Sequence, residues 1–526
     1  MNKGSEHTTS CWMDLPLPWQ GTPLTADARA DVCIVGAGIA GLTTAYLLTE
    51  AGKSVIVLDA GDIAAGQTQR TTAHLSNAID DRFQEIERIH GAESAALAAQ
   101  SHMAAIDLIE TIVHQEAIDC AFERVDGYLF PGQGHDRKFL EQELAACRRA
   151  GLNDVELTER PLGALSGLPC LRFPRQGQFH PLRYLLGLCQ AIRQRGGQIH
   201  THSPVEEVTG GEQASVRTRG GPVVRCSAIV VATNSPINDL VAIHTKQAAY
   251  RTYAIAAQVP RGSVPHALWW DTEDPYHYIR VQQFASPLTG NGTTEAYDLL
   301  IIGGEDHKTG QDSQYADHFA ALENWGRERF PPMGQIAYSW SGQVMETIDG
   351  LAFIGRNPLD NDNVFVATGD SGMGLTHGTI AGFLLGELIQ GRDHPWAKLY
   401  DPARKPLSAL RDFARENANV AWQYTDWLSG GDVKSVDAIP PGAGAVVRRG
   451  LRKLAVCRDD TGALHECSAV CPHLGCIVHW NGVEKTWDCP CHGSRFAADG
   501  KVIEGPAISD LEPVATAEPQ PAASVE

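Results

Sequence analysis

The first clear pattern along the chain is a pair of apolar runs with an amphipathic segment between them, over residues 31–59. Residues 32–35 are a short β-branched run that ends at a glycine, which is typical of a buried parallel strand. Apolar side chains then recur at three- and four-residue spacing from Ile39 to Gly52, where a helix is expected to end. Residues 54–58 form a second apolar run. The pattern predicts a βαβ unit.

A long central stretch gives a mixed pattern, and the first pattern returns after it. Residues 83–117 look helical, whereas from about 120 to 350 short β-branched runs alternate with turns and with a helical piece at 181–195. Residues 364–390 again indicate a strand, a glycine-rich turn and an apolar helix. We therefore expect an α/β domain of the Rossmann type that is interrupted by an α+β domain.

The C-terminal part of the chain has a third pattern. Residues 429–445 are rich in glycine and proline and predict a linker. Residues 446–510 hold short apolar runs separated by turns such as Asp459–Gly462, which predicts hairpins and an all-β domain. Pro, Ala and Glu dominate residues 511–526, so a disordered tail is expected there.

Composition narrows the class of protein. Of the 526 residues, 43% are hydrophobic and 20% are charged, which is typical of a globular chain. The formal net charge is -20, so binding to nucleic acid or to anionic membranes is not expected, because like charges repel. Residues 1–20 lack a signal-peptide pattern, and no apolar run is long enough to span a membrane. A cytoplasmic protein is expected.

A glycine motif stands where the first strand meets the first helix. Gly36, Gly38 and Gly41 form G-x-G-x-x-G. The first permits a tight turn, the second lets the backbone approach a pyrophosphate, and the third lets helix and strand pack closely. Asp59 ends the next strand, where a carboxylate can bind a ribose hydroxyl. The register predicts a dinucleotide site, with NAD and FAD both open.

A late segment decides between the two dinucleotides by resemblance. Residues 349–355 read Asp-Gly-Leu-Ala-Phe-Ile-Gly, and residues 367–374 form a glycine-rich turn. Together with the early motif they resemble the glycine oxidase, sarcosine oxidase and D-amino acid oxidase superfamily. The resemblance implies FAD, with Val205 near the adenine and Gly369, Gly372 and Gly374 beside the flavin. It implies an FAD-dependent oxidoreductase over 28–428, with an FAD-binding part at roughly 28–120, 180–240 and 340–400 and a substrate part at roughly 121–179 and 241–339.

Residues 66–76 lie where this superfamily places a loop against the flavin ring. Within this loop, Arg70, Thr71, Thr72 and His74 are candidate cofactor contacts. Thr71-Thr72-Ala73-His74 resembles the Thr-Thr-Trp-His of dimethylglycine and sarcosine dehydrogenases, whose histidine carries FAD covalently. Two interpretations stay open: a covalent link at His74, or a histidine that lies near the flavin without a bond to it.

A second candidate centre lies near the C-terminus. Cys471 and His473 form C-x-H, and Cys489 and His492 form C-x-x-H, with 15 residues between the two pairs. Thiolates and imidazoles suit zinc or iron. Each loop supplies one cysteine and one histidine, so one iron can take both thiolates and the other both imidazoles, which is the ligand set of a Rieske [2Fe-2S] cluster.

The sequences that contain these four residues, His-Leu-Gly-Cys and Cys-Pro-Cys-His-Gly-Ser, resemble the motifs of the Rieske family. The resemblance implies a disulfide between Cys476 and Cys491 that clamps the two loops. It also implies that the Ser494 hydroxyl bonds a bridging sulfide. Phe496 takes the place of a tyrosine that donates to a ligand sulfur, so we expect a potential below the top of the roughly -150 to +300 mV Rieske range. Cys457 and Cys467 are expected to pack a hairpin.

The two centres together suggest a function. A flavin accepts two electrons as a hydride, and a [2Fe-2S] cluster carries one. The leading hypothesis is oxidation of a C–N bond in a small-molecule amine or amino acid, with electrons leaving through the cluster to an external electron carrier. A reductive flavoenzyme fed through the cluster and a non-enzymatic redox sensor are the alternatives.

The sequence suggests only a few residues that could contact the substrate. Trp269, Trp270, Tyr276 and Tyr278 could wall a pocket, and Arg280 suits a carboxylate. The alternative, which is favoured for any single one of these residues, is that it packs in the core of a strand. His377 follows the late glycine turn and is expected to face the flavin; the alternative is that it caps a helix or lies at the surface. No catalytic base is assigned.

Overall fold

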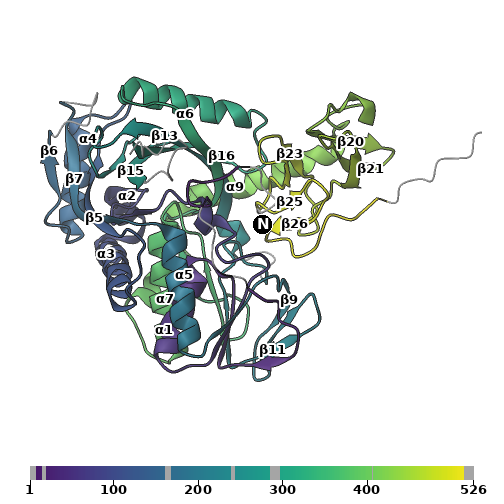
Figure 1. Cartoon of the computed structure of the whole chain (residues 1–526), viewed down its shortest axis with the longest axis horizontal. Helices are drawn as coiled ribbons and strands as arrows, with labels where there is room; N and C mark the ends of the chain where they lie inside the picture. The colour runs from purple at the N-terminus through teal and green to yellow at the C-terminus, as the bar shows by residue number, and fades with distance from the viewer. Residues whose placement is uncertain are drawn as a thin grey trace, which may run out of the picture.

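The computed structural model describes residues 8–14, 19, 21–159, 167–238, 243–284, 297–405 and 407–514. They form a layered α/β domain, a large second sheet beside it, and an all-β domain at the C-terminal end (Figure 1). This is the fold class that the sequence predicts, and it is confirmed.

A six-stranded sheet forms the centre of the α/β domain. Its strands pair in parallel except at one edge, where β18 is antiparallel to β19. Every residue of β2, β3 and β12 is buried, as the unbroken apolar runs predict. The order across the sheet is β18 (Phe353–Arg356), β19 (Val364–Thr368), β12 (Ala228–Val231), β2 (Val32–Val35), β3 (Val55–Leu58) and β8 (Gln198–His200).

Different elements cover the two faces of this sheet. Helices α1 (Ile39–Glu50), α5 (Pro181–Gln194) and α7 (Gly374–Ile389) share a core with one face of β2 and β3. A four-stranded sheet shares a second core with the opposite face. Its strands are β1 (Ala28–Arg29), β11 (Val223–Arg225), β10 (Ser215–Thr218) and β9 (Val205–Thr209).

The second large sheet has nine strands and carries α6 (Tyr315–Arg329) against β13 and β16. β17 runs to Thr347 within this sheet, so the predicted boundary near 340 falls inside a strand. The strands are β17 (Ile336–Thr347), β13 (Gln247–Pro260), β16 (Tyr297–Lys308), β15 (Tyr278–Phe284), β14 (Leu268–Trp270), β5 (Glu123–Leu129), β7 (Cys170–Gln178) and β4 (His74–Leu75), with β6 (Glu156–Thr158) on β7.

Further helices surround these sheets. The sequence predicts helical structure over 83–117, and the structure has two helices there, α2 (Phe83–His90) and α3 (Ala92–Gln115). Gly91 between them has a φ of +84°, which ends α2. The shorter elements are η1 (Gln67–Arg70), α4 (Arg137–Arg149), η3 (His244–Lys246), α8 (Trp396–Leu399) and η4 (Leu407–Ala409).

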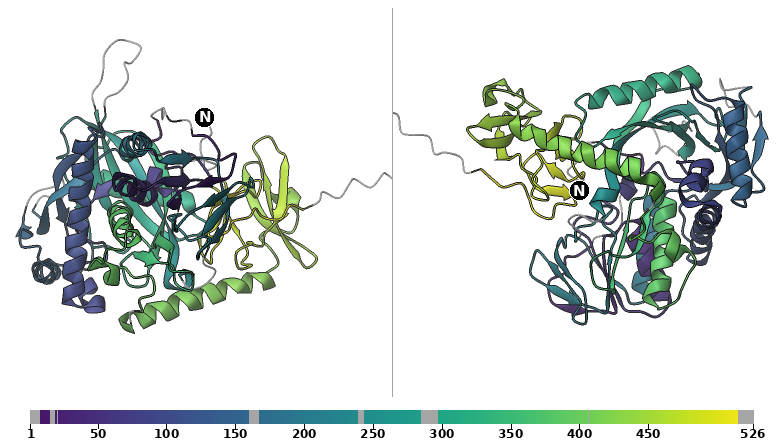
Figure 2. Two further views of the ribbon diagram at one scale, coloured as in Figure 1. Left: turned by 90° about the horizontal axis from the view of Figure 1, so that it is seen from below. Right: turned by 180° about the vertical axis from the view of Figure 1, so that it is seen from behind.

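Helix α9 (Leu410–Gln423) runs along the side of the molecule to the C-terminal domain and continues into η5 (Tyr424–Leu428) (Figure 2). That domain has two small antiparallel sheets, and η6 (Val436–Ala438) precedes them. The strands are β20 (Ala443–Arg449), β21 (Arg452–Arg458) and β22 (Leu464–Ser468), then β23 (His479–Asn481), β24 (Thr486–Asp488), β25 (Arg495–Ala497) and β26 (Val502–Glu504).

The ends of this domain differ from the expected boundaries. Asp432, in the expected linker, donates its backbone N–H to Val446, so linker residues pack on β20. Leu511 is buried and Glu512 accepts from Ser468, so the fold extends past 510 because an apolar side chain fills the core. The rest of the predicted tail, 515–526, lies outside the described residues. Among the described helices, none has the length and apolar character needed to cross a membrane.

Candidate active site and metal centre

The glycine motif forms the turn between β2 and α1. Gly36 has a φ of +111°, and a Cβ there would lie 2.3 Å from the carbonyl oxygen of Ala232. A Cβ on Gly41 would lie 2.0 Å from the carbonyl oxygen of Gly36. At Gly38 the nearest atom to such a Cβ is Oγ1 of Thr68, at 3.1 Å, so no backbone blocks this position. The loop therefore leaves space for a phosphate group at the N-terminus of α1.

Asp59 follows β3 and braces this loop. Its Oδ2 accepts from the Ala37 N–H at 2.6 Å, and its Oδ1 accepts from the Gly61 N–H at 2.8 Å. Burial raises the pKa of Asp59 to about 6, against the lowering effect of these bonds. Each oxygen keeps a further lone pair, so a ribose hydroxyl can still be bound.

A cavity of about 740 Å³ begins at this loop and passes between the two large sheets. Val205 lies at its wall, as do Gly372 and Gly374. Gly369 does not line it: a Cβ there would meet Thr347 at 2.4 Å, so this glycine serves the turn. The volume lies within the range for cofactor pockets, and the open position at Gly38 suits a pyrophosphate, so the residues present fit FAD.

Residues 66–76, which we call the flavin loop, place four predicted residues on the cavity wall: Arg70, Thr71, Thr72 and His74. Nδ1 of His74 lies 3.0 Å from the Thr72 hydroxyl, and Nε2 lies 3.1 Å from the Ile279 carbonyl oxygen. Burial lowers the pKa of His74 to about 3, so the ring is neutral. Because both nitrogens are engaged, a covalent link to FAD requires one of these bonds to break. Covalent attachment stays one of two open interpretations.

The far end of the cavity is aromatic and acidic. Trp270, Tyr276 and Tyr278 line it, together with Asp80 and Asp306. The Tyr276 hydroxyl donates to Asp80 at 2.6 Å. Burial raises the pKa of Asp80, and burial raises that of Asp306 to about 7. Carboxyl groups between aromatic walls suit a cationic nitrogen.

Two other residues that the sequence suggested as substrate contacts do not line the cavity. Trp269 points into a separate core, because successive strand residues face opposite sides of the sheet. Arg280 is fully buried, and its Nη1 donates to the carbonyl oxygens of Thr72, Ala73 and Phe179. Its expected role as a carboxylate ligand is therefore corrected: Arg280 supports the flavin loop from behind.

His377 lies in the first turn of α7 and lines the cavity. Its Nδ1 is 2.8 Å from the Asp370 carbonyl oxygen, and its Nε2 is 3.2 Å from Nε2 of His102. Burial lowers the pKa of His377 to about 4. His377 is therefore neutral and held in place.

Two loops of the C-terminal domain bring four predicted ligands together. The rings of His473 and His492 lie 5.1 Å apart, and the thiol of Cys489 is hydrogen-bonded to Cys471. A disulfide joins Cys476 and Cys491, the pair that the resemblance implies.

Two buried ring nitrogens in these loops, Nε2 of His473 and Nδ1 of His492, have no hydrogen-bond partner among the described residues. Such atoms and paired thiols are what a Cys₂His₂ [2Fe-2S] cluster needs, so the residues fit this group. Ser494 approaches Cys471 and accepts the Ala507 N–H at 3.0 Å.

Comparison with protein families agrees with both sites. The model of the FAD dependent oxidoreductase family (DAO) matches residues 31–388, and the model of the Rieske [2Fe-2S] domain matches residues 430–516. The chain is a member of the DAO family of FAD-dependent oxidoreductases, with a C-terminal Rieske domain. FAD and a [2Fe-2S] cluster are its cofactors, as the sequence predicts.

Known proteins are similar to this oxidoreductase over the FAD-dependent part alone or over both parts. It is 33% identical to the Bacillus subtilis "Putative Rieske 2Fe-2S iron-sulfur protein YhfW", over 93% of this chain and 94% of that one. It is 25% identical to gamma-glutamylputrescine oxidoreductase of Escherichia coli, over 70% of this chain and 85% of that one. The structure of glycine oxidase from Geobacillus kaustophilus superposes with a TM-score of 0.59 at 19% identity, over 72% of this chain and 99% of that one, and so shares the fold.

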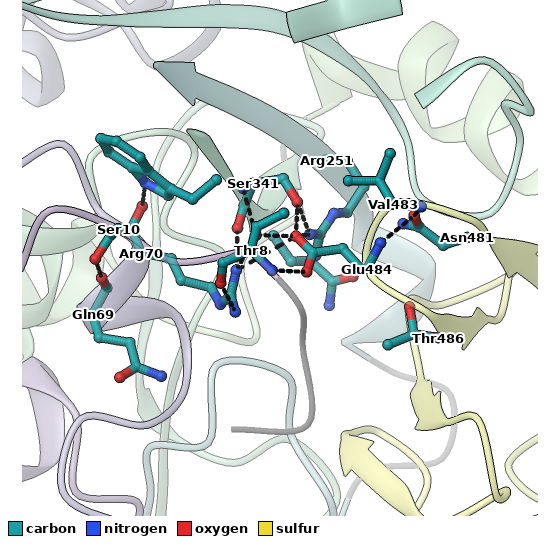
Figure 3. Close-up of polar contacts among 12 residues, drawn as sticks. Thr8, Ser10, Gln69, Arg70, Arg251, Ser341, Asn481, Val483, Glu484 and Thr486 are labelled. Atoms are coloured by element: carbon teal, nitrogen blue, oxygen red, sulfur yellow. Dashed lines mark hydrogen bonds and ion pairs between the residues drawn. The ribbon is translucent and has the colours of Figure 1, made fainter. Parts of the chain in front are cut away.

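One buried carboxylate of the Rieske domain, Glu484, pairs with two arginines of the FAD domain (Figure 3). Glu484 lies fully buried between Arg70 and Arg251, with N···O distances of 3.5 and 3.3 Å. Thr8 and Ser341 also donate to it. Burial alone would raise the pKa of Glu484, but the two arginines and the hydrogen bonds from Ser341 and Thr8 together lower it, so the group is ionised. No sequence pattern marked Glu484.

The Rieske domain also forms part of the flavin cavity. Residues 502–505, 507 and 508 line its wall. Glu504 accepts from Nε2 of Gln67 at 2.9 Å and from Nδ2 of Asn234 at 3.1 Å. The cavity is therefore complete only when both domains are docked.

Two more residues that the sequence did not mark lie between the flavin cavity and the cluster site. Gln343 lines the cavity, and its Nε2 donates to the Gly493 carbonyl oxygen at 3.1 Å, next to the ligand His492. His244 packs against the rings of His473 and His492 at 5.0 and 5.6 Å. The histidine side of the cluster site therefore faces the FAD domain.

Proposed function

We propose that this oxidoreductase oxidises a C–N bond of an amine or amino acid and sends the electrons through the Rieske cluster to an external one-electron carrier. Gln343 carries the proposal, because its side chain joins the flavin cavity wall to the cluster loop through the 3.1 Å bond to Gly493. With FAD in the cavity and the cluster held by its loops, Gln343 would lie between the two groups, which would suit direct electron transfer.

The electron balance defines the role of each centre. Removal of a hydride from carbon and a proton from nitrogen converts CH–NH to C=N and releases two electrons. FAD takes up both electrons together, and a [2Fe-2S] cluster carries one at a time. Each substrate molecule therefore reduces two molecules of a one-electron carrier.

Features of the cavity favour an amine over an α-amino acid. Asp80 and Asp306 face the aromatic end of the cavity, whereas Arg280 is bound to backbone carbonyl oxygens and is not available for a substrate carboxylate. With a pKa of about 7, Asp306 suits the removal of a proton from a substrate ammonium, which must be neutral to release hydride. The name of the Escherichia coli relative also supports an amine donor.

An anaerobic titration tests the proposal. The holoenzyme is mixed with a panel of amines and amino acids, and the visible flavin absorbance and the EPR signal of the cluster are recorded over time. We expect flavin bleaching first and a Rieske signal afterwards. Bleaching only by a reduced carrier would favour the reverse electron flow, and no reaction with any donor would favour a redox sensor.

A further inference from the structure

We infer that the surface over the outer side of the cluster loop is the docking site of a small, acidic one-electron carrier protein. The inference rests on the proposed function, because it names the partner class that receives the electrons. The inner side of the cluster site is covered by His244 and Gln343, so electrons must leave on another side.

The outer side is formed by the cluster loop and η5. The Tyr424 hydroxyl donates to the Leu474 carbonyl oxygen at 2.7 Å, and Nε1 of Trp427 donates to the Gly475 carbonyl oxygen at 3.0 Å. Leu474 directly follows the ligand His473.

These side chains are exposed although they are apolar. Leu428, at the end of η5, is 83% exposed, and Tyr424, Trp427 and Leu474 are each more than a third exposed. We call these four residues the outer patch. An exposed apolar patch beside a redox centre is typical of a protein contact.

A basic hairpin borders the outer patch. Nη1 of Arg448 donates to the Ser429 carbonyl oxygen at 3.2 Å, which places the β20–β21 turn next to Leu428. Arg448, Arg449, Arg452 and Lys453 lie at this turn, and Leu451 at its tip is 89% exposed. Arg449 is paired with Glu466, and Lys453 is buried near Asp426 and Asp432, so Arg448 and Arg452 are the cations that the hairpin presents to solvent.

The charge of the hairpin selects the partner. The whole chain has a net charge of -20 and repels acidic proteins over most of its surface. A local group of cations beside an apolar patch attracts an acidic carrier to this one place and supplies the charged rim of the contact.

Stopped-flow mixing tests the site without a substrate. The cluster of the holoenzyme is reduced chemically, excess reductant is removed, and the protein is mixed anaerobically with plastocyanin, an acidic blue-copper protein. One electron passes from the reduced cluster to Cu(II). We expect the rate to fall with ionic strength, because salt screens opposite charges. A basic cytochrome c should react more slowly.

Two variants and two matched controls locate the contact. Arg452→Glu should slow plastocyanin reduction on the order of tenfold at low salt and less at high salt. Leu428→Ser should slow it at all salt concentrations. Arg29→Glu, with the same charge change on the exposed strand β1, and Leu359→Ser, at a 97% exposed leucine of the FAD domain, should behave as wild type.

The EPR spectrum and iron content must stay unchanged in all four variants, which separates docking from cluster loss. Wild-type rates in Arg452→Glu and Leu428→Ser, or a plastocyanin rate that rises with salt, would overturn the inference. The inference would also be overturned if the wild-type protein is a dimer, Leu428→Ser dissociates this dimer, and the plastocyanin rate stays the same. Failure of every amine to reduce the flavin would defeat the proposed function alone, because this test starts from a chemically reduced cluster.

Discussion

The cluster site and the flavin cavity are built from the chain in different ways. All four cluster ligands come from residues 471–492, on two loops that the Cys476–Cys491 disulfide joins. The cavity wall draws on segments from residue 35 to residue 508. A compact motif specifies chemistry almost alone, whereas a distributed cavity depends on how distant elements dock. The following predictions test this difference.

Loss of one cluster ligand should give the largest effect. Cys489→Ser should abolish the Rieske EPR signal completely, because a hydroxyl replaces one of the two thiolates. FAD should remain bound, as measured by the flavin absorbance of the purified protein. The matched control is Cys457→Ser: this thiol is buried but donates to the Ala498 carbonyl oxygen, outside the ligand set. A normal EPR signal in Cys489→Ser would remove this residue from the ligand set.

Loss of the Glu484 ion pairs between the two domains should give the second-largest effect. Glu484→Ala leaves Arg70 and Arg251 buried without their counter-charge, which should lower the free energy of unfolding by about 3–5 kcal/mol. Because Arg70 belongs to the flavin loop, FAD retention should also fall. Denaturant unfolding and the flavin content measure the two effects.

Glu141→Ala is the control for Glu484→Ala. Glu141 pairs with Arg137 on the exposed surface of α4, and its loss should change stability by less than about 1 kcal/mol. Equal effects of the two substitutions would show that the two domains do not depend on Glu484.

The aromatic end of the cavity should respond to pH. Asp306 has a raised pKa of about 7, so it is protonated below this pH and accepts a proton only above it. The rate of flavin reduction by an amine should therefore rise with pH through about 7. In Asp306→Asn this rise should disappear, and the rate above pH 7 should fall on the order of 10²-fold. An unchanged pH profile in the variant would exclude Asp306 as the proton acceptor.

The smallest expected effect concerns the cluster potential. Phe496 is fully buried beside the cluster loops and has no hydroxyl to donate to a ligand sulfur. Phe496→Tyr should raise the midpoint potential, because such a donor stabilises the reduced cluster. EPR-monitored redox titration measures the shift. A wild-type potential near the upper limit of about +300 mV would contradict the expectation.

Sequence reasoning succeeded where a short motif carries its own geometry. The glycine triplet is recognised because a strand, a helix and an acidic residue stand in register around it, and two of its glycines, Gly36 and Gly41, lie where a Cβ would meet a backbone carbonyl oxygen. The C-x-H and C-x-x-H pairs also specify their ligands locally. Arg280 was misplaced, because a strand pattern does not show whether a buried guanidinium meets a ligand or backbone carbonyl oxygens.

Glu484, Gln343 and His244 had no signal in the sequence. Each is a common polar residue in an ordinary segment, and its role exists only because a residue far away in the chain lies opposite it. Glu484 meets Arg70 across more than four hundred positions, and Gln343 meets Gly493 across 150.

The sequence by itself located the dinucleotide site, the candidate cluster ligands and the order of the domains, because these follow from the local spacing of glycine, cysteine and histidine. The choice of FAD over NAD came from the resemblance of residues 349–355 and 367–374 to a known family. Only the tertiary structure decided that the Rieske domain completes the flavin cavity and that a buried carboxylate holds it there. Docking depends on complementary surfaces from distant segments, and such surfaces have no periodicity along the chain.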